Sequence, residues 1–169
     1  RYPTRVQGLV LICGAPGRAL DTFQNSDTGK RLLPHLKNLT NKHREAVART
    51  LRLVMPTDIA YFVAQNTELN KELVRKEDFM PYLEHCASMP PDLFVRMLED
   101  AAERRSAGFL NRLLMPALII AGERDGFTPA HVSQAMVDAI PNGRMELLLN
   151  GSHTAPIELP EEIQTLIQR

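Results

Sequence analysis

The sequence contains no tryptophan, and only 5% of its residues are aromatic. It also has no excess of either charge, because its 20 basic and 20 acidic side chains cancel. Proteins that bind nucleic acid combine a basic surface with aromatic or arginine side chains on which bases stack. We therefore expect no nucleic-acid partner.

Long apolar runs are absent as well. The longest uninterrupted runs cover residues 9–13 and 116–121, whereas a helix that crosses a bilayer needs about 20 apolar residues. Hydrophobic residues still make up 44% of the 169 residues, which is enough to form the buried core of one domain. These features predict a globular protein with no membrane partner.

Cysteine is scarce, with only Cys13 and Cys86, which lie far apart in the sequence. They form no Cys-x-x-Cys pair and no cysteine–histidine spacing of a metal or redox site. Such isolated cysteines suit a reducing compartment, so a cytoplasmic location is predicted. The sequence starts at Arg1 rather than at a methionine, and we therefore expect the chain to be a piece of a longer protein.

Three short apolar runs predict the strands of a sheet. They cover residues 6–13, 117–121 and 145–149, and each stops at or near a glycine. A nearly continuous apolar run of this length is typical of a strand that is buried on both faces, as in a parallel sheet.

Helices are predicted after the second and third runs. Thr128 and Pro129 are expected as the N-cap and first residue of the earlier helix, and the later one runs from about Leu159 to the end. The order strand, helix, strand, helix favours a parallel sheet with helices on its faces. Between the first and second runs, residues 18–114 show only helical patterns interrupted by prolines, which predicts a helical insertion into an α/β domain.

Two polar residues follow neighbouring predicted strands. Asp125 lies just after the second apolar run, and His153 lies just after the third. The carboxyl ends of parallel strands meet at one edge of a sheet, so these side chains can come together across one connecting helix. An Asp that orients a His, with the His as general base, makes up two members of a nucleophilic catalytic triad. An Asp before a glycine can also simply form a turn, and Glu123 is a rival for the acid.

The chain resembles the C-terminal part of the α/β-hydrolase family over nearly its whole length. Residues 1–12 resemble the passage into one of the family's strands, and residues 18–114 resemble its helical cap. Residues 115–125, Met-Pro-Ala-Leu-Ile-Ile-Ala-Gly-Glu-Arg-Asp, are similar to the strand and loop that present the triad acid. Asn150-Gly-Ser-His153 is similar to the loop that presents the triad histidine. The order acid then histidine also fits the family.

This resemblance implies an α/β fold with part of a mainly parallel sheet and an inserted helical cap. The core would comprise residues 1–17 and 115–169, and the cap residues 18–114. It further implies hydrolysis of an ester or related acyl bond of a small molecule, with Asp125 and His153 as catalytic residues and with no metal or organic cofactor. The alternative is a protein of the same fold that only binds or acts as a scaffold.

No Gly-x-Ser-x-Gly motif occurs in the sequence, although this motif presents the nucleophilic serine in the family. The nucleophile would therefore come from a missing N-terminal part. Without that part, the edge of the first strand would be exposed and available to the N-terminal half of the fold or to a second copy of the chain. In the cap, Phe62 and Met97 are candidates to line an apolar acyl pocket, although apolar residues at helical spacing more often form a helical core.

Overall fold

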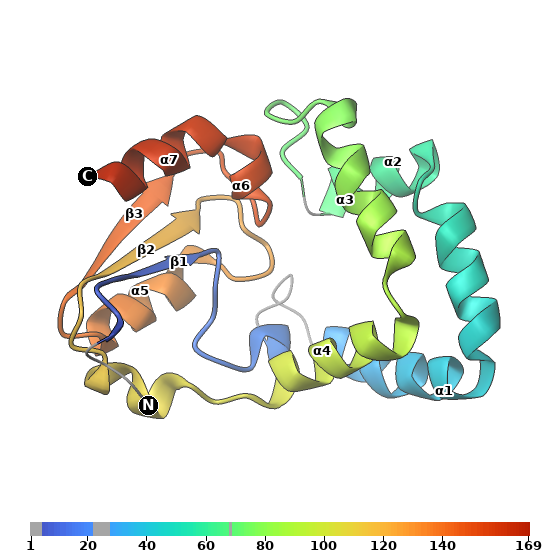
Figure 1. The fold of residues 1–169 in the computed structure, drawn as a ribbon, viewed down its shortest axis with the longest axis horizontal. Helices are drawn as coiled ribbons and strands as arrows, with labels where there is room; N and C mark the ends of the chain where they lie inside the picture. Colours follow the sequence, from blue (N-terminus) through green and yellow to red (C-terminus); the bar gives the residue numbers. More distant parts are fainter. Residues whose placement is uncertain (1–4, 22–27, 68) are drawn as a thin grey trace.

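The computed structural model describes residues 5–21, 28–67 and 69–169. The sheet and the last helices lie on one side of the molecule, and the helices α1 to α4 form a cap on the other (Figure 1). Along the chain the elements are β1 (Leu9–Ile12), η2 (Ala19–Asp21), α1 (Thr28–Val54), α2 (Asp58–Thr67), α3 (Lys76–Ser88), α4 (Pro91–Glu103), η4 (Ala107–Arg112), β2 (Ala117–Gly122), α5 (Ala130–Ala139), β3 (Gly143–Leu148), α6 (Ala155–Glu158) and α7 (Pro160–Gln168). The predicted α/β fold with a partial parallel sheet and a helical cap is confirmed.

The three strands lie in the order β1-β2-β3, and both pairings are parallel. Ala117 at the start of β2 is in register with Leu9 of β1 and with Gly143 of β3. All three strands therefore end at the same edge of the sheet. This places the loops that follow β2 and β3 next to each other.

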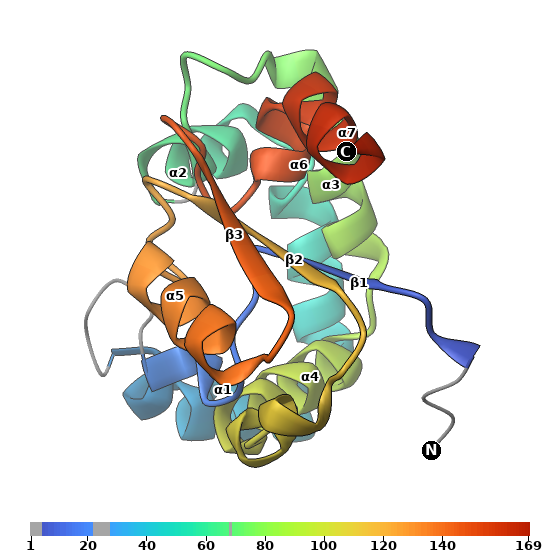
Figure 2. The same cartoon turned by 90° about the vertical axis from the view of Figure 1, so that its left-hand side faces the viewer.

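The central strand β2 is buried at all six positions. Because successive side chains of a strand point to opposite faces, Leu118 and Ile120 pack with Ile163 of α7, whereas Ile119 packs with Met136 of α5. Helices thus cover both faces of the sheet, with α5 on one side and α6 and α7 on the other (Figure 2). The continuous apolar pattern of this strand follows from its two covered faces.

The outer strands depart from the sequence prediction, which expected all three strands to be buried on both faces. Val10 of β1 and Leu147 of β3 are 43% and 44% exposed. Within the described residues each of these strands has one neighbour, β2, so its other edge is open. The third strand also begins two residues earlier than predicted, at Gly143, and Leu149 lies beyond its end.

The cap is built around its own apolar core. Phe79 of α3 is fully buried, and Tyr61 of α2 and Leu83 of α3 are part of the same cluster. The long helix α1 has non-helical backbone angles at His43, with φ of −135° and ψ of 39°, so it consists of two helical segments joined at a kink. None of the helices in the described part of the chain combines the length and apolar character of a membrane span.

The division of the chain into core residues 1–17 and 115–169 and cap residues 18–114 stays a prediction. Residues 1–4 and 22–27, which belong to the predicted core and cap respectively, lie outside the described residues.

Candidate active site

Asp125 and His153 lie on two neighbouring loops at the carboxyl-terminal edge of the sheet. We call residues 123–129, after β2, the acid loop and residues 149–154, after β3, the histidine loop. The backbone N–H of Arg124 donates to the carbonyl oxygen of Gly151 at 2.8 Å, which joins the two loops. A Cβ at Gly122 would lie 2.6 Å from the carbonyl oxygens of Gly151 and Ser152. Glycine at the end of β2 therefore permits this close approach.

The predicted contact between the two side chains is present. Nδ1 of His153 lies 3.0 Å from Oδ2 and 3.2 Å from Oδ1 of Asp125. The Asp125 side chain is completely shielded from solvent, whereas that of His153 is 32% exposed. A buried carboxylate that faces one nitrogen of a partly exposed imidazole fixes the proton on that nitrogen. The other nitrogen, Nε2, is then free to accept a proton.

Three further hydrogen bonds hold the Asp125 carboxylate. Oδ1 accepts the backbone N–H groups of Phe127 and Thr128, each at 2.8 Å. Oδ2 lies 2.8 Å from the hydroxyl of Thr128, which is also 2.9 Å from the carbonyl oxygen of Cys13 at the end of β1. The acid is therefore held by its own loop, and the single proton of the Thr128 hydroxyl is donated either to Asp125 or to Cys13.

Thr128 has a different role from the one predicted. The sequence pattern indicated that Thr128 was the N-cap of a helix, but α5 begins at Ala130 and its N-cap is Pro129, with no side-chain cap. The Thr128 hydroxyl turns towards Asp125 because the buried carboxylate offers a stronger acceptor than a neutral partner. The only feature of the sequence that could have indicated this role is the position of Thr128, three residues after Asp125.

The pKa of the Asp125 carboxyl is the result of opposing effects. Burial raises the pKa. The hydrogen bond from His153, those from Thr128 and the charge of His153 lower the pKa by more than burial raises it. The net shift is downward, so the carboxylate is ionised at neutral pH. An ionised carboxylate is the form that orients the imidazole and stabilises its positive charge.

The His153 ring is supported on one face by an aromatic side chain. The rings of Phe127 and His153 are stacked, with centroids 4.7 Å apart and an interplanar angle of 22°. Within the part of the chain that the structure describes, no hydrogen bond reaches Nε2 of His153. The contacts on Nδ1 and on the ring face thus fix the imidazole while leaving Nε2 for a reacting group.

No described residue next to this pair has the properties of a nucleophile. Burial and the negative charge of Asp125 raise the pKa of the Cys13 thiol to about 12, and a protonated thiol is a poor nucleophile. Ser152 is buried, and its hydroxyl donates to Glu158. Ser133 is fully buried in α5. The source of the nucleophile stays a prediction.

Glu123, the rival acid, is turned away from the histidine. Its Oε2 accepts the backbone N–H of Asn150 at 2.8 Å, so the exposed carboxylate supports the start of the histidine loop. Among the described residues, no three His, Cys, Asp or Glu side chains come together in a group that could hold a metal ion.

The candidate acyl-pocket residues of the cap lie at its surface. Phe62 on α2 is 66% exposed and Met97 on α4 is 53% exposed. A separate apolar pocket of about 410 Å³ lies among α1, α2, α3 and α4, and neither residue lines it. Its walls include Val63, Phe94 and Tyr82. Among the apolar cap residues that the sequence offers for such a pocket, Met55 and Phe94 line it, whereas Phe62 and Met97 do not.

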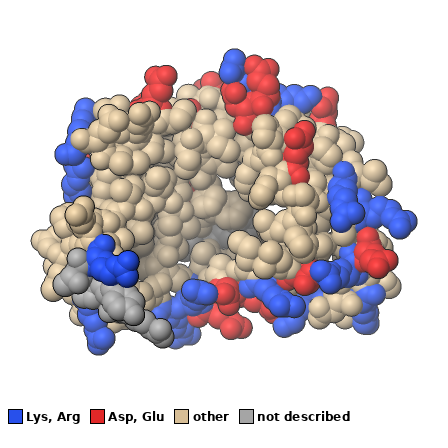
Figure 3. All heavy atoms as spheres, in the orientation of Figure 1, with Lys and Arg blue, Asp and Glu red and all other residues tan. Residues whose placement is uncertain are grey.

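The molecule is hollowed between the sheet and the cap. In Figure 3 the atoms around this hollow are mostly uncharged, and the Lys, Arg, Asp and Glu side chains lie mainly towards the outer edge of the molecule in this view. An uncharged concave surface is typical of a site for a largely apolar small molecule.

Comparison with solved structures supports the fold. The chain is 19% identical to a thermophilic esterase from Thermogutta terrifontis, with a TM-score of 0.66 over 99% of this chain and 56% of that one. For a hydrolase from Oleispira antarctica the identity is 19% and the TM-score 0.65, over 99% and 57%. For an esterase from Exiguobacterium antarcticum the values are 14% and 0.62, over 96% and 56%.

The chain therefore spans little more than half the length of these solved structures. A comparison with curated protein sequences found no match. The sequence model of the alpha/beta hydrolase fold family matches residues 1–160, and the chain belongs to that family.

Proposed function

We propose that the complete protein hydrolyses an ester or related acyl bond by a Ser-His-Asp mechanism. Asp125 and His153 are the acid and base, and the nucleophilic serine belongs to an N-terminal part outside these 169 residues. The observation that carries this proposal is the hydrogen bond of 3.0 Å between His153 Nδ1 and the buried Asp125 carboxylate, at the ends of adjacent strands. Family membership and the similarity to two esterases support it.

The proposed reaction follows from the arrangement of the two side chains. Nδ1–H of His153 donates to Asp125, so Nε2 accepts the serine proton while the serine oxygen attacks the acyl carbonyl. The Asp125 carboxylate stabilises the imidazolium that forms. His153 then gives this proton to the leaving alcohol, which departs as the acyl-enzyme forms. In the second half, Nε2 takes a proton from water as the water oxygen attacks the acyl carbonyl, and His153 then returns this proton to the serine oxygen as the acid departs.

The cap supports an apolar acyl group as part of the substrate. The pocket of about 410 Å³ among the cap helices is lined mainly by apolar side chains, including Val63 and Phe94. Burial of each methylene of an acyl chain contributes about 0.8 kcal/mol. Phe62 and Met97 remain candidates for substrate contact at the cap surface.

The function is tested by assaying the full-length protein against p-nitrophenyl esters of increasing acyl length. Hydrolysis above the uncatalysed rate is expected, and His153→Ala should abolish it, since no general base then remains. Phe94→Ala should shift the preference towards longer acyl chains because it widens the pocket. Phe62→Ala and Met97→Ala provide the matched comparison at positions that do not line this pocket.

A wild-type protein that hydrolyses none of these esters, or a His153→Ala variant with unchanged rates, would contradict the proposal. Identical acyl-length profiles for the three cap variants and the wild type would show that these three cap residues do not determine which acyl chain is preferred.

The partners of the chain are part of the same proposal. Within the described residues β1 pairs with β2 alone, and Val10 of this strand and Val6 shortly before it are exposed. We propose that the N-terminal half of the fold pairs with this edge in the complete protein, and that the isolated chain self-associates there. A cytoplasmic location, expected from the two separated cysteines, also belongs to this proposal.

A further inference from the structure

Glu158 is a carboxylic acid buried directly behind the candidate active site. It is the last residue of the short helix α6, which follows the histidine loop, and it is only 5% exposed. Burying a carboxylate is costly unless hydrogen-bond donors replace its water. Its donors therefore indicate what the residue does.

Three donors come from the two residues that flank His153. The backbone N–H of Ser152 lies 2.6 Å from Oε2 of Glu158, and the Ser152 hydroxyl donates to Oε1. The Thr154 hydroxyl donates to the same Oε1 at 3.1 Å. Because the chain is held on both sides of His153, Glu158 fixes the backbone position from which the imidazole reaches Asp125.

A fourth donor comes from the cap. The backbone N–H of Asn70 lies 2.7 Å from Oε1 of Glu158. The Asn70 side chain extends this contact, since its Nδ2 donates to the carbonyl oxygen of Asn150 at 2.8 Å. One buried carboxylate therefore binds the cap segment that contains Asn70 and the histidine loop at the same time.

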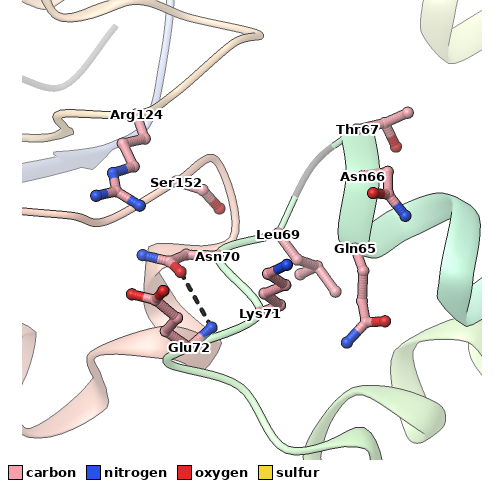
Figure 4. A pocket seen from close by; sticks show the side chains of 9 residues that line it. All are labelled: Gln65, Asn66, Thr67, Leu69, Asn70, Lys71, Glu72, Arg124 and Ser152. Carbon is pink, nitrogen blue, oxygen red and sulfur yellow. Dashed lines mark hydrogen bonds between the residues drawn. The ribbon is translucent and has the colours of Figure 1, made fainter.

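The contacts of Asn70 with Glu158 and Asn150 form an interface between cap and core, which we call the seam. Figure 4 shows Asn70 from the cap facing Ser152 and Arg124 from the two loops across a pocket of about 320 Å³. Beside this seam, Ile157 of α6 packs against the apolar core of the cap. The contact between α6 and the cap is thus both polar and apolar.

We propose that Glu158 is a positioning residue that holds His153 against Asp125 and couples this geometry to the cap through Asn70. The effect on turnover rests on the proposed hydrolase function. The link that Glu158 forms between the histidine loop and the cap segment containing Asn70 does not rest on it. Glu158 acts through the backbone of the histidine loop and does not itself touch the reacting atoms.

The link is tested in the full-length protein by amide hydrogen exchange. Glu158→Gln keeps the size of the side chain, but it removes the charge and places an NH₂ group among donors. Hydrogen bonds to a charged acceptor are stronger than neutral ones, so the amides of Ser152 and Asn70 should both exchange at least about fivefold faster. Glu161→Gln, at an exposed position in the first turn of α7, is the matched control and should change neither amide.

The effect on catalysis is separated from a general loss of stability with a second variant. Ile163→Val shortens a buried core residue of α7 and destabilises the fold without touching the histidine loop. We expect Glu158→Gln to lower kcat by roughly 10- to 100-fold with little change in KM, because a small displacement of a catalytic group has effects of this size. Ile163→Val should leave kcat within twofold.

Several outcomes would overturn the inference. Unchanged exchange at both amides would contradict the role of Glu158, and a change at Ser152 alone would contradict the coupling to the cap. Equal losses of kcat in Glu158→Gln and Ile163→Val would mean that Glu158 only stabilises the fold and does not position His153. A wild-type protein without hydrolase activity would contradict the proposed function, and the exchange result would still decide the coupling.

Discussion

Replacing Asp125 by Asn in the full-length protein is expected to lower kcat by roughly ten-thousandfold, the loss seen when a triad acid is neutralised in a related mechanism. The Asp125 carboxylate accepts hydrogen bonds from Phe127 and Thr128 and faces Nδ1 of His153. An amide has only one acceptor oxygen, so its NH₂ group would point at the imidazole. The histidine would then carry its proton on Nε2, where it cannot accept one from the nucleophile.

Glu123→Gln is the matched control for this prediction. Glu123 lies in the same loop, is exposed and supports Asn150 through a hydrogen bond of 2.8 Å. Its replacement should leave kcat within a few-fold of the wild type. The rates are compared by steady-state hydrolysis of the ester that proves to be the best substrate. An active Asp125→Asn variant, or a damaged Glu123→Gln variant, would contradict the assignment of the acid.

The second prediction concerns the 169 residues expressed alone. We expect this chain to show no ester hydrolysis above background, because the proposed function assigns the nucleophilic serine and the oxyanion hole to the N-terminal part of the protein. We also expect it to self-associate or aggregate. The edge of β1 that does not face β2 has no strand partner among the described residues, and Val10 is 43% exposed there.

Size-exclusion chromatography combined with an ester assay measures both parts of this prediction. The full-length protein, at the same concentration, is the control for both measurements. A monodisperse monomer of the 169 residues that hydrolyses esters would mean that the chain contains a nucleophile of its own.

The parts of the site that the sequence predicts are those tied to strand ends. Ala117 to Ala121 form a continuous apolar run, which marks a strand covered on both faces, and Asp125 follows it directly. His153 follows the next strand in the same way. Since parallel strands end at one edge, the pairing of these two side chains follows from the order of the elements.

The contacts that hold the site could not be predicted in the same way. Glu158 and Asn70 are separated by 88 residues, and no local pattern links a glutamate after the histidine to a cap residue. Thr128 was misassigned because Thr before Pro is a common helix start, and only the folded chain shows that its hydroxyl lies beside the acid. The open edge of β1 was expected from the missing N-terminal part, whereas the exposure of β3 was not, because an apolar run does not reveal how many neighbours a strand has.

The central claim is that Asp125 and His153 activate a serine that lies outside these 169 residues. The most direct measurement treats the full-length protein with a fluorophosphonate, which reacts with activated serines, and locates the label by peptide mass spectrometry. The account predicts one labelled serine on a residue before Arg1, with labelling lost in His153→Ala and strongly slowed in Asp125→Asn. A label on Ser133 or Ser152, or labelling that does not depend on His153, would contradict it.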